Sequence, residues 1–418
     1  MSNVLIGCIA DDFTGASDAA SFLAKSGLKT LLVNEIPAGG LPVDGCDAVV
    51  VGMKTRSIPP QDAVRSTVKA LEWLQRLEPR QYYIKYCSTF DSTPRGNIGP
   101  TVDAAMDMLE AECTVLCPSL PVNGRTVRAG RLYVNGVPLA ESPMKHHPLN
   151  PMWASDIPEL MRPQGRYPCL VLGAGAGDAA REAAEGFRRQ HGRCYLVPDY
   201  ETDQQGRQIA ETWGHLKLLT GGSGLLEHLA GRARGARTGG MAYTGTRGRA
   251  LMLCGSCSQA TGEQIRCFRA SGGAAVAVDP RALSSGAQTA EGLWEAIQER
   301  APEPVLVYSV GAEQSEEQRR QAGAGAARLL EKTMAELGKR AVEAGFSRLI
   351  VAGGETSGAV MLALGMEAFY IGPSVAPGVP VMIPAGKTGM RVVLKSGNFG
   401  QGDFFARALE MTRMDGEL

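Results

Sequence analysis

Lys85-Tyr-Cys-Ser-Thr-Phe-Asp-Ser-Thr-Pro-Arg-Gly-Asn-Ile-Gly-Pro100 is the stretch of sequence around which the rest of the chain is organised. An apolar run at residues 82–84 precedes it and predicts a buried strand, and the apolar spacing of residues 102–109 predicts a helix after it. The stretch is therefore a strand-to-helix turn, and in an open parallel sheet such turns lie where ligands bind. Its ammonium, hydroxyls, carboxylate, amide and guanidinium favour a polyhydroxylated anion as ligand, with an ordinary polar loop as the alternative.

Strand and helix patterns alternate along the first half of the chain. Residues 4–10, 28–33 and 48–51 are apolar runs that predict buried strands. Residues 16–24 and 63–77 have the apolar spacing of helices. Repetition of strand, turn and helix predicts an α/β fold with a largely parallel sheet.

The length of 418 residues exceeds the size at which one hydrophobic core keeps growing, so two domains are expected. Residues 231–249 are rich in glycine and arginine and predict a linker. The α/β pattern resumes at residues 250–254 and continues to a last helix from Asp403. We therefore expect two α/β domains, at residues 1–230 and 250–418, with largely parallel sheets facing a central cleft.

Composition narrows the class of protein. The 43 Lys and Arg residues balance 43 Asp and Glu residues, so no overall field favours nucleic acid or an acidic membrane. No run of about eighteen apolar residues occurs, and the amino terminus lacks a signal-peptide pattern. The ten cysteines lack zinc spacing, and Cys254 and Cys257 suit small apolar packing better than a redox pair. We expect a cytoplasmic protein with reduced thiols.

Two adjacent carboxylates follow the first predicted strand, in Asp11-Asp12-Phe-Thr-Gly15. Neighbouring acids repel each other, which is typical of a site that meets a cation, a metal or a substrate hydroxyl. Asp12 or Thr14 could instead cap the next helix, but capping explains only one acid. Arg56, after another strand, could hold a carboxylate through two parallel N–H bonds or be a solvated surface arginine.

Glycine turns after strands of the second half predict an anion site. They lie at residues 255–262, which include Ser258, at residues 353–358 and at residues 395–400. Such turns leave backbone N–H groups at helix amino termini for a phosphate. Residues 386–388, Gly-Lys-Thr, do not complete a P-loop because Val381 stands where its first glycine would be, so any nucleotide is held differently.

Two other motifs have competing interpretations. Residues 170–177 end in a glycine-rich segment before Asp178 and resemble part of a dinucleotide loop, but the full motif with a downstream acid is absent. We predict a tight strand-to-helix turn there, with Asp178 in the first helical turn. His146 and His147 lie in a proline-rich loop, where they could contact a ligand or simply be solvated.

Together with three other motifs, the Lys85 stretch resembles the four-carbon acid sugar kinases. The three are Ile-Ala-Asp-Asp-Phe-Thr-Gly-Ala-Ser-Asp at 9–18, Gly-Gly-Glu-Thr-Ser-Gly at 353–358 and Lys-Ser-Gly-Asn-Phe-Gly at 395–400. Their order is similar to that of the family over nearly the whole chain. The wording of residues 85–93, Lys-Tyr-Cys-Ser-Thr-Phe-Asp-Ser-Thr, is closest to the 3-oxo-tetronate kinase branch.

The resemblance implies an ATP-dependent kinase that phosphorylates the terminal hydroxyl of a four-carbon sugar acid. It implies sugar acid in the first domain, and ATP with Mg²⁺ in the second. The acid expected first is 3-oxo-tetronate, with D-threonate and D-erythronate as alternatives. The rival functions are an NAD-dependent oxidoreductase and a non-catalytic sugar-acid sensor. Metal ligands stay open, and a homodimer is the assembly to test.

The resemblance also suggests roles for particular residues. Asp12 and Asp91 are the candidate general bases for the terminal hydroxyl. Arg56 and Lys85 are expected to hold the substrate carboxylate, and Asp11, Ser88 and Asn97 to complete the substrate site. The expected ATP site consists of Ser258, Gly353, Gly354, Glu355, Thr356, Ser357, Gly358 and Gly400.

Overall fold

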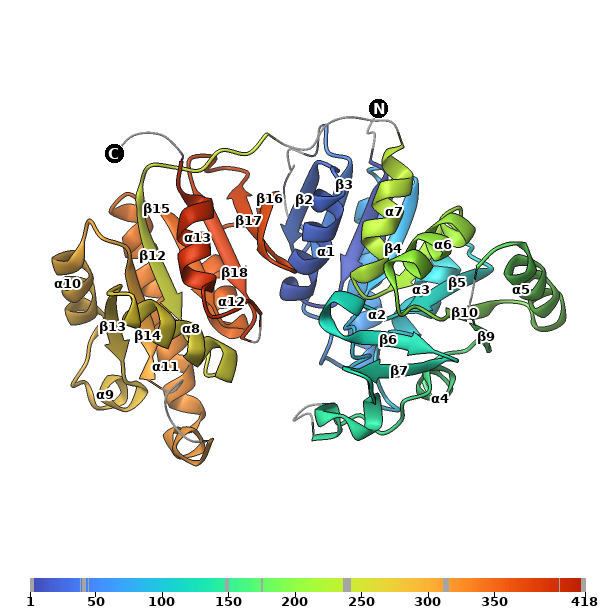
Figure 1. Ribbon diagram of the computed structural model, residues 1–418, viewed down its shortest axis with the longest axis horizontal. Helices are drawn as coiled ribbons and strands as arrows, with labels where there is room; N and C mark the ends of the chain where they lie inside the picture. Colours follow the sequence, from blue (N-terminus) through green and yellow to red (C-terminus); the bar gives the residue numbers. More distant parts are fainter. Residues whose placement is uncertain are drawn as a thin grey trace. The chain divides into compact units, whose positions relative to one another are not determined.

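The computed structural model describes residues 4–414, apart from residues 38, 40–42, 44, 147–149, 174–175, 236–241, 311–315 and 398. The chain divides into two compact units, Met1–Met241 and Ala242–Leu418 (Figure 1). Each unit has a largely parallel sheet with helices packed on it, which confirms the predicted α/β class. The predicted linker, residues 231–249, begins inside helix α7 (Gly224–Arg234) and ends on the first residue of strand β12 (Arg249–Cys254).

The sheet of the first unit is parallel throughout its described strands. Their order across the sheet is β2 (Thr30–Asn34), β3 (Ala48–Gly52), β1 (Ile6–Ala10), β4 (Gln81–Lys85), β11 (Leu218–Gly221), β5 (Cys113–Cys117), β10 (Cys194–Pro198) and β9 (Cys169–Gly173). Strand β1 is wholly buried, as its apolar run predicted. Ala10 pairs with Gly52 on one side and Lys85 on the other, so three strands end side by side.

Helices cover this sheet, with α1 packed on α7 and α2 on α3. The helices are α1 (Phe13–Lys25), α2 (Pro60–Gln75), α3 (Ile98–Met108), α4 (Ile157–Met161), α5 (Asp178–His191), α6 (Asp203–Trp213) and α7, with 3-10 turns η1 (Pro121–Asn123), η2 (Leu139–Glu141) and η3 (Pro143–His146). The buried residues of α2 form a stripe of helical spacing, which agrees with the amphipathic pattern of its sequence.

A small antiparallel sheet follows β5, made by β6 (Arg125–Arg128), β7 (Arg131–Val134) and β8 (Val137–Pro138). Asn135 and Gly136 join β7 to β8 with φ values of 52° and 80°, the left-handed pair that a two-residue hairpin turn needs. The predicted place of Asp178 in a first helical turn is confirmed, because α5 begins at Asp178, after Gly177 with a φ of 88°. Residues 174–175 of the predicted strand-to-helix turn lie outside the described residues.

The second unit has the strand order β13 (Ala274–Val278), β14 (Val305–Ser309), β12, β15 (Phe346–Ala352), β18 (Arg391–Lys395), β17 (Val379–Pro384) and β16 (Ala368–Ala376). The strands from β13 to β18 are parallel, and β17 and β16 are antiparallel additions. Ala352 pairs with Cys254 and with Lys395, so β12, β15 and β18 also end side by side.

The helices of the second unit are α8 (Gln259–Ala270), α9 (Pro280–Ser285), α10 (Ala290–Arg300), α11 (Glu316–Glu343), α12 (Gly354–Leu364) and α13 (Phe404–Thr412). Helix α8 packs with α13, and α11 with α12. Phe404 and Phe405 of α13 join Cys254 and Val393 in a buried apolar cluster. Lys395 lies two residues after Val393 and therefore faces the same side of the sheet as α13.

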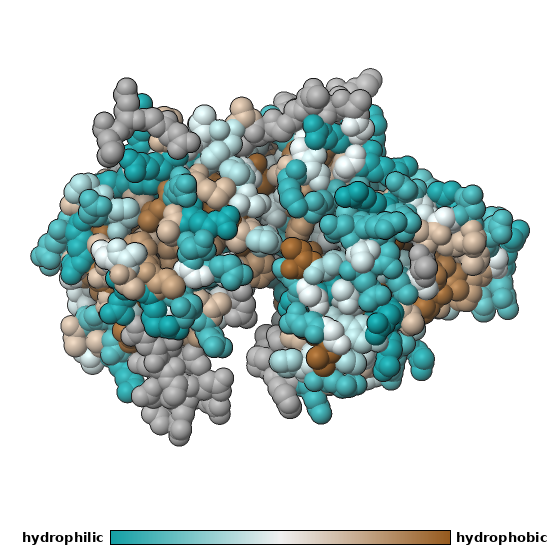
Figure 2. Space-filling model, in the orientation of Figure 1, coloured by the Kyte–Doolittle hydropathy of each residue, from teal (hydrophilic) through white to brown (hydrophobic). Residues whose placement is uncertain are grey.

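Hydrophilic residues predominate on the visible surface of each unit (Figure 2). Within the described ranges, no helix combines the length and apolar character needed to cross a bilayer. All ten cysteines are described, and all are free thiols.

Candidate active site

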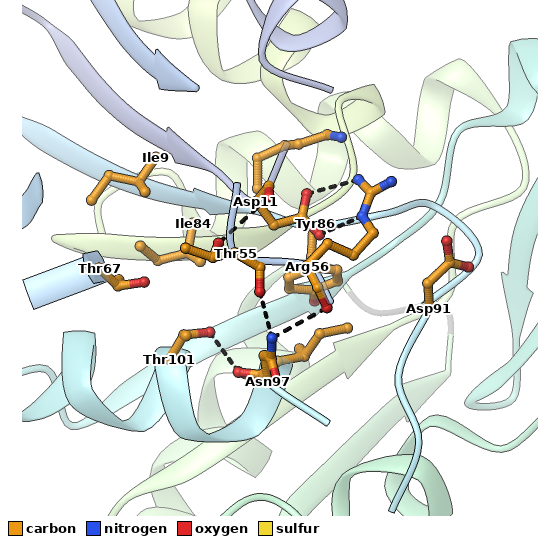
Figure 3. Close-up of a pocket in the computed structure, with 12 residues that line it drawn as sticks. Ile9, Asp11, Thr55, Arg56, Thr67, Ile84, Tyr86, Asp91, Asn97 and Thr101 are labelled. Carbon is orange, nitrogen blue, oxygen red and sulfur yellow. Dashed lines mark hydrogen bonds and ion pairs between the residues drawn. The ribbon is translucent and has the colours of Figure 1, made fainter. Parts of the chain in front are cut away.

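The ends of β1, β3 and β4 border a pocket in the first unit (Figure 3). The pocket brings together predicted substrate residues that are as far apart in the sequence as Asp11 and Asn97. Its lining residues are Ile9, Asp11, Thr55, Arg56, Thr67, Ile84, Lys85, Tyr86, Asp91, Asn97, Ile98 and Thr101.

Arg56 joins the two adjacent acids. Its Nε donates to Asp11 Oδ2 and its Nη2 to Asp11 Oδ1, each at 2.8 Å, and Nη2 also lies 2.8 Å from Asp12 Oδ1. Burial alone would raise the pKa of Asp11, but the charge and hydrogen bonds of Arg56 lower this pKa below its ordinary value. The Arg56 guanidinium thus neutralises a carboxylate pair that would otherwise repel itself.

Asp12 has a second partner, the backbone of helix α1. Its Oδ1 accepts a hydrogen bond of 2.8 Å from Gly15 N, so the capping interpretation of Asp12 is confirmed. Capping and ion pairing occupy Oδ1, whereas Oδ2 has no hydrogen bond to any described residue. A structural role and a role toward ligand are therefore compatible in Asp12.

Lys85, the last residue of β4, is only 5% exposed. Its Nζ makes no hydrogen bond within the described part of the chain, and the acid atom paired with it, Asp12 Oδ1, is 4.0 Å away. Burial would lower the pKa of Lys85, but Asp12, Asp11 and Asp18 raise it above its ordinary value. Lys85 is thus a permanently charged ammonium with unused donors, which points to an anionic or carbonyl ligand.

Glycine is needed at position 15 because of Lys85. A Cβ at Gly15 would overlap both Lys85 Nζ and Asp12 Oδ1. The sequence Asp-Phe-Thr-Gly therefore provides an acid that caps α1 and, three residues later, the space through which the lysine reaches the pocket.

Asn97 fixes the segment that carries Arg56. Its Nδ2 donates to the carbonyl oxygens of Arg56 at 3.2 Å and of Thr55 (Figure 3). It also donates to the Ile58 carbonyl at 3.0 Å. The amide nitrogen is therefore engaged within the protein. Direct binding of substrate by Asn97 stays a prediction, and within the described residues only its Oδ1 remains unbonded for it.

Asp91 reaches the pocket through an unusual backbone turn. Phe90 is buried and has a φ of 49°, a left-handed conformation that is costly for a bulky side chain and typical of constrained sites. Thr89 Oγ1 donates to Asp91 Oδ1 at 2.6 Å. Ser88 is half-buried and is not among the lining residues of the pocket. The side chain of His146 and all of His147 lie outside the described residues, so their roles stay predictions.

Asp18 of α1 is a buried acid near Lys85 that was not selected from the sequence as a site residue. Its Oδ2 accepts a hydrogen bond from Ser223 Oγ, and its Oδ1 has no partner. Burial raises its pKa, although Lys85 and Ser223 act in the opposite direction. An aspartate within an otherwise small and apolar helix stretch is the sequence signal that could have identified it.

In the second unit, turns from β12, β15 and β18 pack against one another. Gly255 N and Ser256 N donate to the Ala352 carbonyl at 3.1 and 3.2 Å, and Gly353 N donates to the Lys395 carbonyl at 2.9 Å. A Cβ at Gly255 would overlap Thr356 Oγ1. The structure thus brings the predicted nucleotide turns to one edge of one sheet.

The first turn of α12 contains most of the predicted ATP residues. Gly354 and Glu355 are exposed, Gly358 is half-buried, and Thr356 and Ser357 are each 4% exposed. Ser357 Oγ is buried without a hydrogen-bond partner. A helix amino terminus attracts anions through its free N–H groups. An unpartnered hydroxyl in the same turn adds a donor.

Ser258 and Gly400 have clear structural roles. Ser258 caps α8 by accepting from Thr261 N at 3.2 Å, and its Oγ donates to the Gly397 carbonyl at 2.6 Å. Gly400 has a φ of 80°, and a Cβ there would lie 2.6 Å from the Phe404 ring. Their contact with a nucleotide stays a prediction.

Lys395 is the functional candidate that the sequence reasoning did not select in this unit. It ends β18 and is 1% exposed. The available signal was a lysine at the end of an apolar strand, as at Lys85. Among the described residues, no group of three His, Cys, Asp or Glu side chains could hold a metal ion, so the metal ligands remain open.

Two family models match the chain. One, described as a sugar-binding N-terminal domain, matches residues 6–229, and the other, a nucleotide-binding C-terminal domain, matches residues 251–405. The chain is 41% identical to a Brucella melitensis protein, over 99% of this chain and 97% of that protein. It is 43% identical to a Salmonella typhimurium protein, over 96% and 98%. Both relatives are named 3-oxo-tetronate kinase.

Solved structures show the same fold. A crystal structure from Salmonella typhimurium LT2, described as that of a candidate tRNA synthase, has a TM-score of 0.86 at 42% identity and covers 96% of this chain and 98% of its own. The Haemophilus influenzae protein HI1011 has a TM-score of 0.84 at 37% identity, with coverage of 97% and 100%. The likeness extends over nearly the whole of each chain.

Proposed function

The chain belongs to the family that combines a sugar-binding N-terminal domain with a nucleotide-binding C-terminal domain, and we propose that it is an ATP-dependent kinase of 3-oxo-tetronate. The reaction would transfer the γ-phosphoryl group of ATP to the terminal, 4-hydroxyl group. The observation that supports the proposal best is Lys85, a buried cation without a hydrogen bond to any described residue, beside the acids that a hydroxylated ligand would need. The predicted resemblance to 3-oxo-tetronate kinases is confirmed by the relatives.

The first unit is the proposed sugar-acid site, within the domain expected at residues 1–230. Lys85 would receive the substrate carboxylate or the neighbouring keto oxygen. Arg56 would contribute Nη1, which has no hydrogen bond within the described residues, while its Nε and Nη2 remain on Asp11. Asp11 would therefore act by holding Arg56 rather than by touching substrate. Ser88 and Asn97 Oδ1 are further candidates for substrate hydroxyls.

Asp12 is the proposed general base, with Asp91 as the alternative. Asp12 Oδ2 has no hydrogen bond to a described residue, so it can accept the proton of the terminal hydroxyl as that oxygen attacks phosphorus. Phosphoryl transfer depends chiefly on positioning and charge neutralisation, which Lys85 and Arg56 supply on the sugar side.

The second unit is the proposed nucleotide site, within the domain expected at residues 250–418 after the linker at 231–249. The turns that carry Ser258, Gly353–Gly358 and Gly400 would hold the phosphates through backbone N–H and hydroxyl groups. Mg²⁺ would arrive with the nucleotide, since it is bound mainly by phosphate and water in such sites. We also propose a cytoplasmic location, in keeping with the free thiols. The homodimer stays a proposal.

The balanced charge of the chain favours a small-molecule substrate over the tRNA suggested by the description of the Salmonella structure. In the described part of the glycine-rich segment, Gly173 ends β9 and Gly177 precedes α5, and neither residue favours the oxidoreductase alternative.

ATP consumption across four-carbon acids tests the proposal. The full chain should form ADP with 3-oxo-tetronate, and phosphorus NMR should show a new phosphate monoester on the terminal carbon. Turnover on D-threonate or D-erythronate alone would keep the kinase and change the substrate. Acid binding without ATP consumption, or reduction of NAD in place of it, would contradict the proposal.

A further inference from the structure

The Gly397 carbonyl accepts three hydrogen bonds from side chains. Ser258 Oγ lies 2.6 Å from it, Thr261 Oγ1 2.8 Å and Lys395 Nζ 2.9 Å. The first two donors come from the amino-terminal turn of α8, and the third ends β18. A carbonyl has two lone pairs, so this one is saturated and its turn is firmly held.

Gln264 of α8 holds the same turn through two further hydrogen bonds. Its Nε2 donates to the Phe399 carbonyl at 2.9 Å and to the Gly400 carbonyl at 3.0 Å. Residues 258, 261 and 264 are spaced by three and therefore share one face of the helix. This face fixes the turn after β18, which is one of the proposed phosphate-binding turns.

Lys395 places a positive charge among these hydrogen bonds, and no described acidic side chain neutralises it. Its Nζ donates to Thr261 Oγ1 at 2.9 Å, Gly397 O at 2.9 Å and Ser396 O at 3.2 Å. No carboxylate of the described residues lies within 4.0 Å of it. A buried cation that meets only neutral acceptors is costly, and an anionic ligand would offset that cost.

The groups around Lys395 come from three elements and are uncharged. Cys254 of β12 has a pKa raised to about 12 by burial, so its thiol is neutral. Thr261 of α8 is a hydroxyl, and the Phe404 ring of α13 lies 5.5 Å from Nζ. Among these neighbours, Lys395 is therefore the charged group at neutral pH.

We propose that Lys395 is the internal cation of the nucleotide site, which fixes Ser396 and Gly397 after β18 and supplies positive charge to the phosphates bound there. This inference rests on the proposed function, because it assumes that a nucleotide binds at these turns. Lys395 is a positioning residue in this scheme, because its 1% exposed side chain acts through the turn. The sugar site does not depend on it.

Proton uptake on nucleotide binding would distinguish this role of Lys395 from simple packing. Burial lowers the pKa of Lys395 to about 8. Bound phosphate favours the ammonium form and so raises this pKa, which means that the protein takes up a proton on binding above pH 8. By linkage, nucleotide affinity should be about tenfold weaker at pH 9 than at pH 7. The phosphates do not contribute, because their last pKa is about 6.

Isothermal titration of the full chain with Mg²⁺ and a non-hydrolysable ATP analogue measures this uptake. At pH 8.5, in two buffers of different ionisation enthalpy, the unmodified protein should take up most of one proton. Lys395→Met should lose the uptake, bind at least tenfold more weakly at pH 7, and show a flat affinity between pH 7 and 9. Lys387→Met, at an exposed lysine of the same unit, is the matched control and should behave as the unmodified protein.

Thr261→Val weakens the hydrogen bonds of this turn while the lysine is kept. It keeps the side-chain shape but removes one donor to Gly397 and one acceptor of Lys395, so affinity should fall severalfold while proton uptake remains. Nucleotide binding by the unmodified protein without proton uptake would overturn the inference and leave the kinase proposal intact, even if Lys395→Met did not fold. Full affinity and uptake in Lys395→Met would overturn it as well. Absence of nucleotide binding in the unmodified protein would contradict the proposed function itself.

Discussion

Lys85 of the first unit and Lys395 of the second occupy similar places, since each is the buried last residue of an interior strand. Their surroundings are opposite. Lys85 is surrounded by three acids and has no hydrogen bond to a described residue, and its pKa is raised. Lys395 has three hydrogen bonds, no described acid nearby, and a pKa lowered to about 8. The same residue at a similar place thus serves as a fixed charge in one unit and as a proton-sensitive anchor in the other.

The two proposed sites also differ in the groups that would recognise the ligand. The proposed sugar site uses charged side chains whose geometry is set by other side chains, as Arg56 is set by Asp11 and Asn97. The proposed nucleotide site uses backbone turns held by hydroxyls and an amide. Directional charges suit a small acid with several distinct groups, and repeated N–H groups suit phosphates.

The largest effect on turnover is expected from the acids of the first unit, Asp12 and Asp91, which have no counterpart among the described residues around Lys395 in the second unit. Asp12→Asn should lower kcat by about 10²- to 10⁴-fold, because an amide cannot accept the hydroxyl proton. Asparagine still caps a helix, so folding should be preserved. Steady-state kinetics of Asp12→Asn and Asp91→Asn, with Glu72→Gln at an exposed acid as control, would identify the base. Near-full turnover in both folded variants would refute a carboxylate base at this site.

A pair of glycine substitutions should affect the two units separately. The Cβ in Gly15→Ala would displace Lys85 and Asp12, and that in Gly255→Ala would displace Thr356. We expect Gly15→Ala to raise the KM for the sugar acid about tenfold with little change for ATP, and Gly255→Ala to do the reverse, because each displaced side chain belongs to one proposed site. Gly231→Ala, where an added Cβ meets nothing within 4 Å, is the control. Equal changes of both KM values in either variant would show that the sites are not separable in this way.

Substitution of two side-chain amides should also affect the two ligands separately, with smaller changes in affinity. Asn97 holds the Arg56 segment and Gln264 holds the turn at 399–400, each through backbone carbonyls. Loss of such bonds costs about 1 kcal/mol each, so Asn97→Ala should weaken sugar-acid binding severalfold and Gln264→Ala nucleotide binding. Titration with each ligand measures both effects. If Asn97→Ala abolished acid binding altogether, a direct contact with substrate would be the better explanation.

The smallest change is expected in the pH dependence of sugar-acid binding. The pKa of Lys85 is raised and that of Asp11 lowered, so the lysine stays protonated and the aspartate ionised throughout pH 6–9. The dissociation constant of the sugar acid should therefore stay constant over this range, whereas nucleotide affinity should fall above pH 8. Calorimetry with each ligand at pH 6, 7.5 and 9 checks this. A loss of acid affinity between pH 7.5 and 9 would mean that Lys85 titrates there.

Much of the fold could be predicted from the sequence because central parallel strands are continuous apolar runs. Strands β1, β2 and β3 fall on the apolar runs at residues 4–10, 28–33 and 48–51. Strand β16 was not predicted, because Gly372 and Pro373 interrupt its apolar pattern. Local patterns therefore predict the strands with continuous apolar runs, but not a strand whose apolar run is interrupted by glycine and proline.

The grouping of the proposed sugar-site residues in one pocket could be predicted from the sequence, but the hydrogen-bond partners of these residues could not. Arg56, Lys85, Asp91 and Asn97 all line one pocket, as the strand-end argument expected. Which acid the arginine holds, and which carbonyls Asn97 binds, depend on contacts between segments about forty residues apart. The environment of Lys395 depends likewise on α8 and α13, and spacing within a motif carries no information on such contacts.

Hydrogen–deuterium exchange of the full chain with each ligand alone tests the division of roles between the two units. We expect 3-oxo-tetronate to protect residues 11–15, 55–58 and 85–97, and Mg²⁺ with the ATP analogue to protect residues 254–258, 353–358 and 395–397. Protection of the first set by nucleotide, with the second set unchanged, would contradict it.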